Sequence, residues 1–267
     1  MTVAVGARKV RTSWPIGVVR GRMVLAEEGV MTTFVLIPGA GGQAWYWHRV
    51  VPRLRFRGHE AVAVDLPSGD EEARLEDYVR TVVHAVPPGS TRDAGGTGLA
   101  VVGQSLGGLV APIVAERCAA DLLVLVAPMV PRPGESGGEW WQATGQGDAM
   151  QRFAAEQGRD PDAVDDDTLY FHDVPEPVRA EMVRRPFEQT EGPLLDPWPL
   201  DRWPDVPTRV VVGGEDRLFP LDFTTALARE RVGVEPDVID TGHLAALADP
   251  DALVDVLDRY ALEVIGG

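Results

Sequence analysis

Short uninterrupted runs of apolar residues recur along the chain, and this pattern constrains the fold more than any other feature of the sequence. The runs lie at residues 34–37, 61–64, 99–102, 122–126, 209–212 and 238–239. Because they lack the polar–apolar alternation of a strand with one wet face, we expect strands that are buried on both faces. Such strands are typical of a mainly parallel sheet.

Longer stretches with helical spacing separate these runs. They lie at residues 45–57, 75–86, 109–120 and 250–264. Strands that alternate with helices indicate a parallel sheet covered by helices on both faces. We therefore expect an α/β fold, and 267 residues are enough to bury its core.

The alternation stops between residues 129 and 205, a segment rich in glycine, proline and acidic residues that holds four of the seven tryptophans. A loop of this length without secondary structure would be implausible inside a compact domain. We therefore expect a helical cap insertion over the strand ends, with helices near 147–157 and 176–185. The α/β core would then consist of residues 31–128 and 206–267.

Charge and hydropathy exclude several classes of protein. The formal net charge of −16 argues against nucleic acid as a partner, since binding to phosphates needs clustered cations. No stretch approaches the ~18 apolar residues of a membrane span. Residues 1–30 carry five basic residues but lack the apolar core of a signal peptide. We expect a poorly ordered N-terminal extension and a cytoplasmic protein, and the sequence does not indicate an oligomeric state.

Cysteine and lysine each occur once in this chain. A single cysteine, Cys118, excludes a disulfide framework and a cysteine metal cluster, and the histidines and carboxylates lack metal-ligand spacing. Lys9 is the only lysine, so no mechanism downstream of it can depend on an amine. We expect no metal and no cofactor.

The most informative motif is Gly103-Gln104-Ser105-Leu106-Gly107, a G-x-S-x-G sequence between an apolar run and a predicted helix. A serine on such a tight turn is held above the sheet, and the small residues beside it let neighbouring chain approach. The amide of Leu106 then points toward negative charge that develops at the helix N-terminus. These features predict a nucleophilic Ser105; the alternative is a serine that only caps a helix.

Two further candidates follow later strands. Asp216 comes after the run at 209–212, and His243 comes after the run at 238–239. The order Ser, Asp, His, with each residue at a strand end, is the order found in α/β-hydrolase enzymes. We expect His243 to accept the proton of Ser105 and Asp216 to orient the imidazole. Glu215 and Asp240 are the competing orienting acids.

The glycine-rich loop after the first strand has two interpretations. Residues 39–44 match the dinucleotide-binding pattern G-x-G-x-x-A, and Asp65 follows at about the distance expected of an acid that binds the ribose of the cofactor. This pattern predicts a dinucleotide-dependent oxidoreductase. Two observations argue against this interpretation. Residues 45–48 have bulky side chains at the place where a cofactor-binding helix normally packs closely, and the chain has no lysine after Lys9 that could serve as the catalytic lysine of a short-chain dehydrogenase. We favour the other interpretation, an oxyanion loop in which the N–H of Ala40 lies opposite that of Leu106.

Together these motifs resemble the branch of the α/β-hydrolase superfamily that holds plant methyl esterases, hydroxynitrile lyases and bacterial pyrethroid-type esterases. The resemblance extends over residues 33–128 and 207–261 and is carried by residues 34–47, 50–54, 58–59, 103–108, 213–216 and 242–243. Over the insertion it is faint, and residues 170–175 are the best local match. It implies the α/β-hydrolase fold, with a central parallel sheet and a helical cap.

Three positions distinguish this chain within that branch. Pro38 stands where a histidine is usual, which alters the local hydrogen bonding of the oxyanion loop but not its backbone donor. The lyases have a threonine where this chain has Gly39, and a lysine after the catalytic histidine where it has Leu244. Because no ammonium group is available to stabilise departing cyanide, the resemblance implies hydrolysis.

The sequence thus predicts a serine hydrolase that cleaves a carboxylic ester of a small apolar or aromatic molecule through an acyl-enzyme. The alternatives are lactone, thioester or C–C hydrolysis, a biosynthetic cyclisation, and a ligand-binding protein with a vestigial site. The candidate substrate-binding residues are Gly39, Gln104, Trp140, Trp141 and His172. For the tryptophans the alternative role is packing, and for His172 it is an ordinary place in the insertion.

Overall fold

A parallel sheet forms the centre of the molecule. The structure, a computed structural model, describes residues 31–92, 95–162, 165–185 and 188–266, so the extension predicted for residues 1–30 lies outside the described residues. The six strands have the order β2-β1-β3-β4-β5-β6, and every neighbouring pair is parallel. They are β1 (Thr33–Ile37), β2 (Glu60–Ala63), β3 (Leu99–Gln104), β4 (Leu122–Val126), β5 (Thr208–Gly213) and β6 (Asp237–Ile239).

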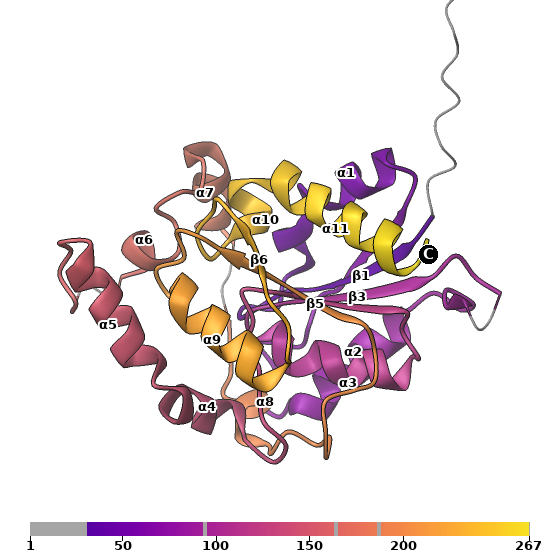
Figure 1. Cartoon of the computed structure of the whole chain (residues 1–267), viewed down its shortest axis with the longest axis horizontal. Helices are drawn as coiled ribbons and strands as arrows, with labels where there is room; N and C mark the ends of the chain where they lie inside the picture. The colour runs from indigo at the N-terminus through magenta and orange to yellow at the C-terminus, as the bar shows by residue number, and fades with distance from the viewer. Residues whose placement is uncertain (1–30, 93–94, 163–164, 186–187, 267) are drawn as a thin grey trace, which may run out of the picture.

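Helices cover both faces of this sheet (Figure 1). One face carries η1 (Ala44–Trp47), α1 (Val51–Phe56), α10 (Ala245–Ala248) and α11 (Pro250–Val264). The other face carries α2 (Leu75–Ala85), α3 (Gly107–Arg117) and α9 (Leu221–Arg231). The predicted α/β fold, a mainly parallel sheet with helices on both faces, is confirmed. Within the described ranges, no helix is both long and apolar enough to cross a membrane.

The side chains of each central strand divide between two hydrophobic cores, because successive residues of a strand point to opposite faces of the sheet. In β1, Phe34 and Leu36 pack with the residues of η1, α1 and α11. Val35 and Ile37 pack instead with the residues of α2, α3 and α9. All four side chains have no exposed surface, as the uninterrupted apolar runs predict.

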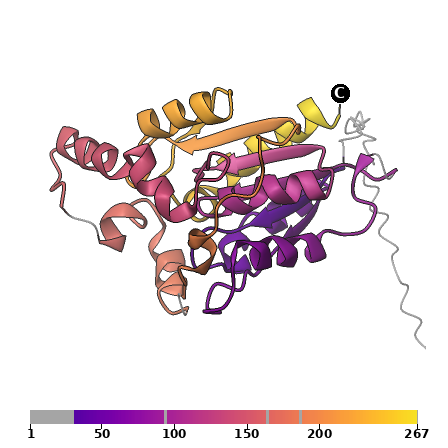
Figure 2. The same ribbon diagram turned by 90° about the horizontal axis from the view of Figure 1, so that it is seen from below.

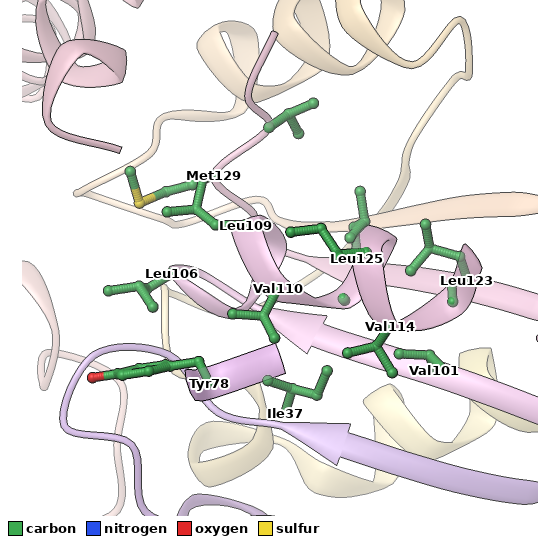
Figure 3. Packing of buried hydrophobic residues seen from close by; sticks show 14 of the residues in the cluster. Ile37, Tyr78, Val101, Leu106, Leu109, Val110, Val114, Leu123, Leu125 and Met129 are labelled. Atoms are coloured by element: carbon green, nitrogen blue, oxygen red, sulfur yellow. The ribbon is translucent and has the colours of Figure 1, made fainter. Parts of the chain in front are cut away.

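The start of α3 packs directly onto the sheet. Figure 3 shows Leu106, Leu109 and Val110 gathered with Ile37 of β1 and Val101 of β3 in one buried cluster. Interdigitated apolar side chains of this kind leave little freedom to the backbone that carries them. The packing therefore holds the first turn of α3, and the residues just before it, in place relative to the sheet.

Outside the insertion, the structure differs from the predicted helices between residues 45 and 57 and at helices α9 and α10, which the sequence does not predict. Residues 45–57 form η1 and the separate helix α1, with Pro52 in the first turn of α1; proline has no N–H to continue a preceding turn but suits a helix start. Helix α9 is absent from the sequence prediction. Its buried residues are Thr224, Leu227 and Ala228 only, which is too weak an apolar stripe to mark a helical period.

The segment between β4 and β5 is helical. In the described part of the chain it contains α4 (Gly137–Thr144), α5 (Gln146–Glu156), α6 (Asp166–Leu169), α7 (Glu176–Met182) and α8 (Gly192–Leu195). Helices α5 and α7 lie where the sequence predicts helices. Most of the segment gathers at one end of the sheet (Figure 2). The division into core and cap at residues 129 and 205 stays a prediction.

Candidate active site

Ser105 occupies the turn between β3 and α3 with a φ of 52°, in the left-handed region where residues other than glycine are strained. The backbone holds this turn in place. The Ser105 N–H donates to the carbonyl of Val126 at 3.0 Å, and the Ser105 carbonyl accepts from the N–H of Met129 at 2.9 Å. A Cβ at Gly103 would lie 2.5 Å from the carbonyl oxygen of Gly107, so glycine is required beside the turn.

The structure brings Ser105, His243 and Asp216 together, although they are far apart in the sequence. Nε2 of His243 lies 3.0 Å from Oγ of Ser105, and Nδ1 of the same ring lies 2.8 Å from Oδ2 of Asp216. The side chains of His243 and Asp216 are only 2% and 1% exposed. In this geometry an imidazole can remove a proton from a hydroxyl group through Nε2, while the carboxylate fixes the imidazole tautomer that carries the proton on Nδ1.

The carboxylate of Asp216 is fully engaged. Its Oδ1 accepts from the N–H groups of Leu218 at 2.9 Å and Phe219 at 2.8 Å, which leaves Oδ2 for His243. These backbone donors compensate the cost of burying a charge. Glu215 and Asp240, the competing acids, are both exposed, so the structure selects Asp216 as the partner of His243.

The position of the site follows from the strand order. β1 and β3 are neighbours, but the chain continues from β1 to β2 on one side and from β3 to β4 on the other. Open α/β sheets bind ligands in the crevice at such a reversal, outside the carboxyl ends of the strands. The Gly39 loop follows β1 and Ser105 follows β3, so both lie at this point.

The loop after β1 approaches the serine closely. A Cβ at Gly39 would lie 2.4 Å from Oε1 of Gln104 and 2.9 Å from Cβ of Ser105, so this position also requires glycine. Ala40 is the next residue and is exposed, whereas Leu106, the residue after Ser105, is buried. The loop therefore lies against Ser105, and the oxyanion role of the Ala40 and Leu106 N–H groups stays a prediction.

The carboxylate that the dinucleotide interpretation assigns to a ribose has another role. Oδ1 of Asp65 accepts from the N–H of Ala44 at 2.7 Å, within the chain that follows the glycine-rich loop. Trp47, one of the bulky residues after that loop, is completely buried in the core. Both observations argue against the dinucleotide interpretation of this motif.

Gln104 makes a hydrogen bond to the backbone of His243. Its side chain is 2% exposed, and its Nε2 donates to the carbonyl oxygen of His243 at 3.3 Å. The rings of Phe219 and Tyr170 stand edge-on to the imidazole, with centroids 5.0 Å and 5.7 Å from it. The structure thus gives Gln104 a contact with the histidine loop, and its predicted contact with substrate stays a prediction.

The candidates in the insertion occupy different environments. Trp140 has no exposed surface, and its indole N–H donates to the carbonyl of Val130 at 3.0 Å, so the structure favours packing over substrate contact for this residue. Trp141 is 36% exposed, and its ring centroid lies 5.8 Å from that of Phe219. Trp141 can therefore extend the aromatic wall that begins beside His243.

His172 lies close to Gly242, the residue before His243. A Cβ at Gly242 would lie 2.8 Å from Nε2 of His172. Burial lowers the pKa of His172, and the neighbouring Asp173 carboxylate opposes part of that shift. The sequence analysis does not identify Asp173, Phe219 or Tyr170 as site residues; the local match at residues 170–175 is the one signal that points to part of this group.

The polar groups at Ser105 are suited to proton transfer. Among the residues that the structure describes, no group of three or more histidine, cysteine, aspartate or glutamate side chains is placed to hold a metal ion. The arrangement at Ser105 can perform nucleophilic attack with general base assistance.

Comparisons with known proteins agree with this geometry. The sequence profile described as "Alpha/beta hydrolase family" matches residues 34–256. A probable esterase, PIR7A, from Oryza sativa subsp. indica is 37% identical over 114 residues, which cover 39% of this chain and 42% of that protein. Methylesterase 7 from Arabidopsis thaliana is 24% identical over 259 residues, covering 85% of this chain and 97% of the relative.

Solved structures share the fold. Polyneuridine aldehyde esterase superimposes with a TM-score of 0.64 at 19% identity, over 86% of this chain and 99% of that one. A pyrethroid hydrolase from Sphingobium faniae JZ-2 gives a TM-score of 0.63 at 17% identity, over 86% and 97% of the two chains. These proteins fall in the branch that the sequence motifs resemble. Since the family profile spans most of its length, the chain belongs to the alpha/beta hydrolase family.

Proposed function

We propose that this protein is a serine hydrolase that cleaves carboxylic esters. The observation that carries the proposal is the relay in which His243 contacts Ser105 at 3.0 Å and Asp216 at 2.8 Å. The names of the rice esterase and the Arabidopsis methylesterase support the same reaction class. The chain's own residues supply a nucleophile, a base and an orienting acid, so no step of the reaction needs a cofactor.

In the acylation step, Oγ of Ser105 attacks the ester carbonyl while Nε2 of His243 takes its proton. Asp216 holds the imidazole with Nδ1–H toward the carboxylate and stabilises the imidazolium that forms. The same histidine then gives the proton to the departing alcohol. Water, activated by His243, releases the acyl group from Ser105 in the second half of the reaction.

Negative charge on the carbonyl oxygen is stabilised by the N–H groups of Leu106 and Ala40. Leu106 is the first residue after the nucleophile, at the start of α3, and Ala40 follows the glycine that touches Ser105. Each such donor contributes about 2.7–4 kcal/mol to transition-state stabilisation.

The surroundings of the relay suit a small apolar or aromatic ester. Phe219 and Tyr170 flank the imidazole, and Trp141 lies beyond Phe219. Burial raises the pKa of Tyr170 to about 12, so its phenol stays neutral at the site. Hydroxynitrile elimination is disfavoured, because Gly39 leaves no room for the lyase threonine and Leu244 stands in place of the lysine.

A panel of p-nitrophenyl and methyl esters graded by acyl length tests the proposal, with Ser105→Ala assayed beside the wild-type protein. If the relay acts as a unit, the variant loses roughly 10³–10⁶-fold in turnover on the preferred ester. Near-normal turnover by Ser105→Ala would overturn the assignment. We also propose that the protein is cytoplasmic, which fractionation of expressing cells tests.

A further inference from the structure

The segment 165–174 of the insertion, here called the clasp, has a local structure of its own. Asp165 caps α6, with Oδ1 accepting from the N–H of Thr168 at 2.8 Å. After α6, the N–H of Phe171 donates to the carbonyl of Asp166 at 3.1 Å, and the N–H of Val174 donates to that of Phe171 at 3.1 Å. The clasp is therefore a compact turn that can present side chains in fixed directions.

The clasp contacts the loop that carries the catalytic histidine. Oδ2 of Asp173 accepts from the N–H of Gly242 at 2.5 Å, across 69 residues of sequence. Gly242 directly precedes His243 and is buried. A Cβ at Gly242 would lie 2.8 Å from Oδ1 of Asp173, so the glycine lets the carboxylate approach the backbone. A hydrogen bond to a charged acceptor is about twice as strong as one between neutral groups.

The clasp also contacts the loop that carries the orienting acid. Nη1 of Arg217, the residue after Asp216, donates to the carbonyl of Thr168 at 3.2 Å. The ring of Tyr170 packs edge-on to the imidazole of His243 at 5.7 Å between centroids. One segment of the insertion thus touches both loops whose side chains make the relay to Ser105.

We propose that Asp173 is a positioning residue for His243: its carboxylate fixes the Gly242–His243 backbone so that Nε2 stays within reach of Oγ of Ser105. The inference rests on the proposed serine hydrolase function. The histidine is then held from three sides, by Asp216 at Nδ1, by Gln104 at its carbonyl oxygen and by Asp173 at the preceding amide. Removing the carboxylate leaves the buried Gly242 N–H without its acceptor and frees the loop to shift.

Labelling by a fluorophosphonate probe tests the inference, because its rate reports the reactivity of Ser105 without knowledge of the natural substrate. The variants are Asp173→Ala, which removes the acceptor, and Asp173→Asn, which keeps an oxygen acceptor of the same shape. Asp173→Leu keeps a branched, somewhat larger side chain without an acceptor and serves if the alanine variant does not fold. Asp196→Ala is the matched control. Asp196 also lies in the insertion, and it accepts a backbone N–H at 3.3 Å, that of Leu75 at the start of α2.

We expect Asp173→Ala and Asp173→Leu to label roughly ten- to a hundredfold more slowly per folded molecule, because displacements of about 1 Å in a catalytic group have effects of this size. Asp173→Asn should recover most of the rate, and Asp196→Ala should label like the wild type even if its Tm falls. Wild-type labelling rates in folded Asp173→Ala or Asp173→Leu, or equal slowing in Asp196→Ala, would overturn the inference. Failure of the wild-type protein itself to label would instead overturn the proposed function.

Discussion

Gly39→Ala should damage catalysis through one added carbon atom. The new Cβ would lie 2.4 Å from Oε1 of Gln104 and 2.9 Å from Cβ of Ser105. Carbon atoms pack at roughly 3.5–4.0 Å, so the neighbours must move by about 1 Å. Gln104 cannot yield freely, because it also donates to the carbonyl of His243. The displacement therefore falls on the nucleophile, and a misplacement of about 1 Å costs on the order of 10²-fold in rate.

The assay is kcat/KM on a p-nitrophenyl ester, together with thermal unfolding. Overpacking of this kind lowers the free energy of unfolding by about 1–3 kcal/mol, which the unfolding curve separates from the kinetic loss. Gly147→Ala is the matched control: this glycine lies in α5, its added Cβ meets nothing within 4 Å, and activity should not change. If Gly39→Ala keeps kcat/KM within about threefold of the wild type, the close approach of loop and nucleophile is refuted.

Three further perturbations follow from particular contacts. Asp216→Asn should lower kcat by about 10⁴-fold because the amide no longer fixes the imidazole tautomer, whereas Glu215→Gln, at an exposed position, should leave kcat nearly unchanged in the same steady-state assay. Ser136→Ala removes the cap of α4 and should lower the free energy of urea unfolding by about 1 kcal/mol. Burial raises the pKa of Asp258, but hydrogen bonds from His59 and a neighbouring arginine outweigh it and hold the pKa below the usual value. Its stabilisation is therefore complete above the unfolded-state pKa of about 3.9 and is lost as the pH falls through the folded-state pKa. The difference in Tm between the wild type and Asp258→Asn should shrink from pH 7 to pH 3; a difference that stays constant would contradict this reasoning.

The parts of the molecule that sequence patterns predict are those set by local chemistry. The turn at Ser105 needs small neighbours and a strand before it, and both are visible in consecutive residues. Asp216 and His243 are predictable because each follows its own apolar strand, and parallel strands place their carboxyl ends at one edge of the sheet. The motif order therefore predicts a convergence that no single motif contains.

The contacts across the insertion are not predictable in this way. The hydrogen bond between Asp173 and Gly242 spans 69 residues and depends on how the clasp docks, which no local period encodes. Trp140 illustrates the same point: an aromatic residue in an insertion suits a pocket or a core equally well until its neighbours are known. Its indole is buried against Phe219, with ring centroids 5.3 Å apart, and so contributes to packing.

The reactivity of a single hydroxyl group tests the whole account most directly. Folded protein is treated with a fluorophosphonate, digested, and the modified peptide identified by mass spectrometry, with His243→Ala treated in parallel. Covalent phosphonylation at Ser105, strongly slowed when the imidazole is removed, is the predicted result. An unmodified Ser105 in folded wild-type protein, or equal modification with and without His243, would contradict it.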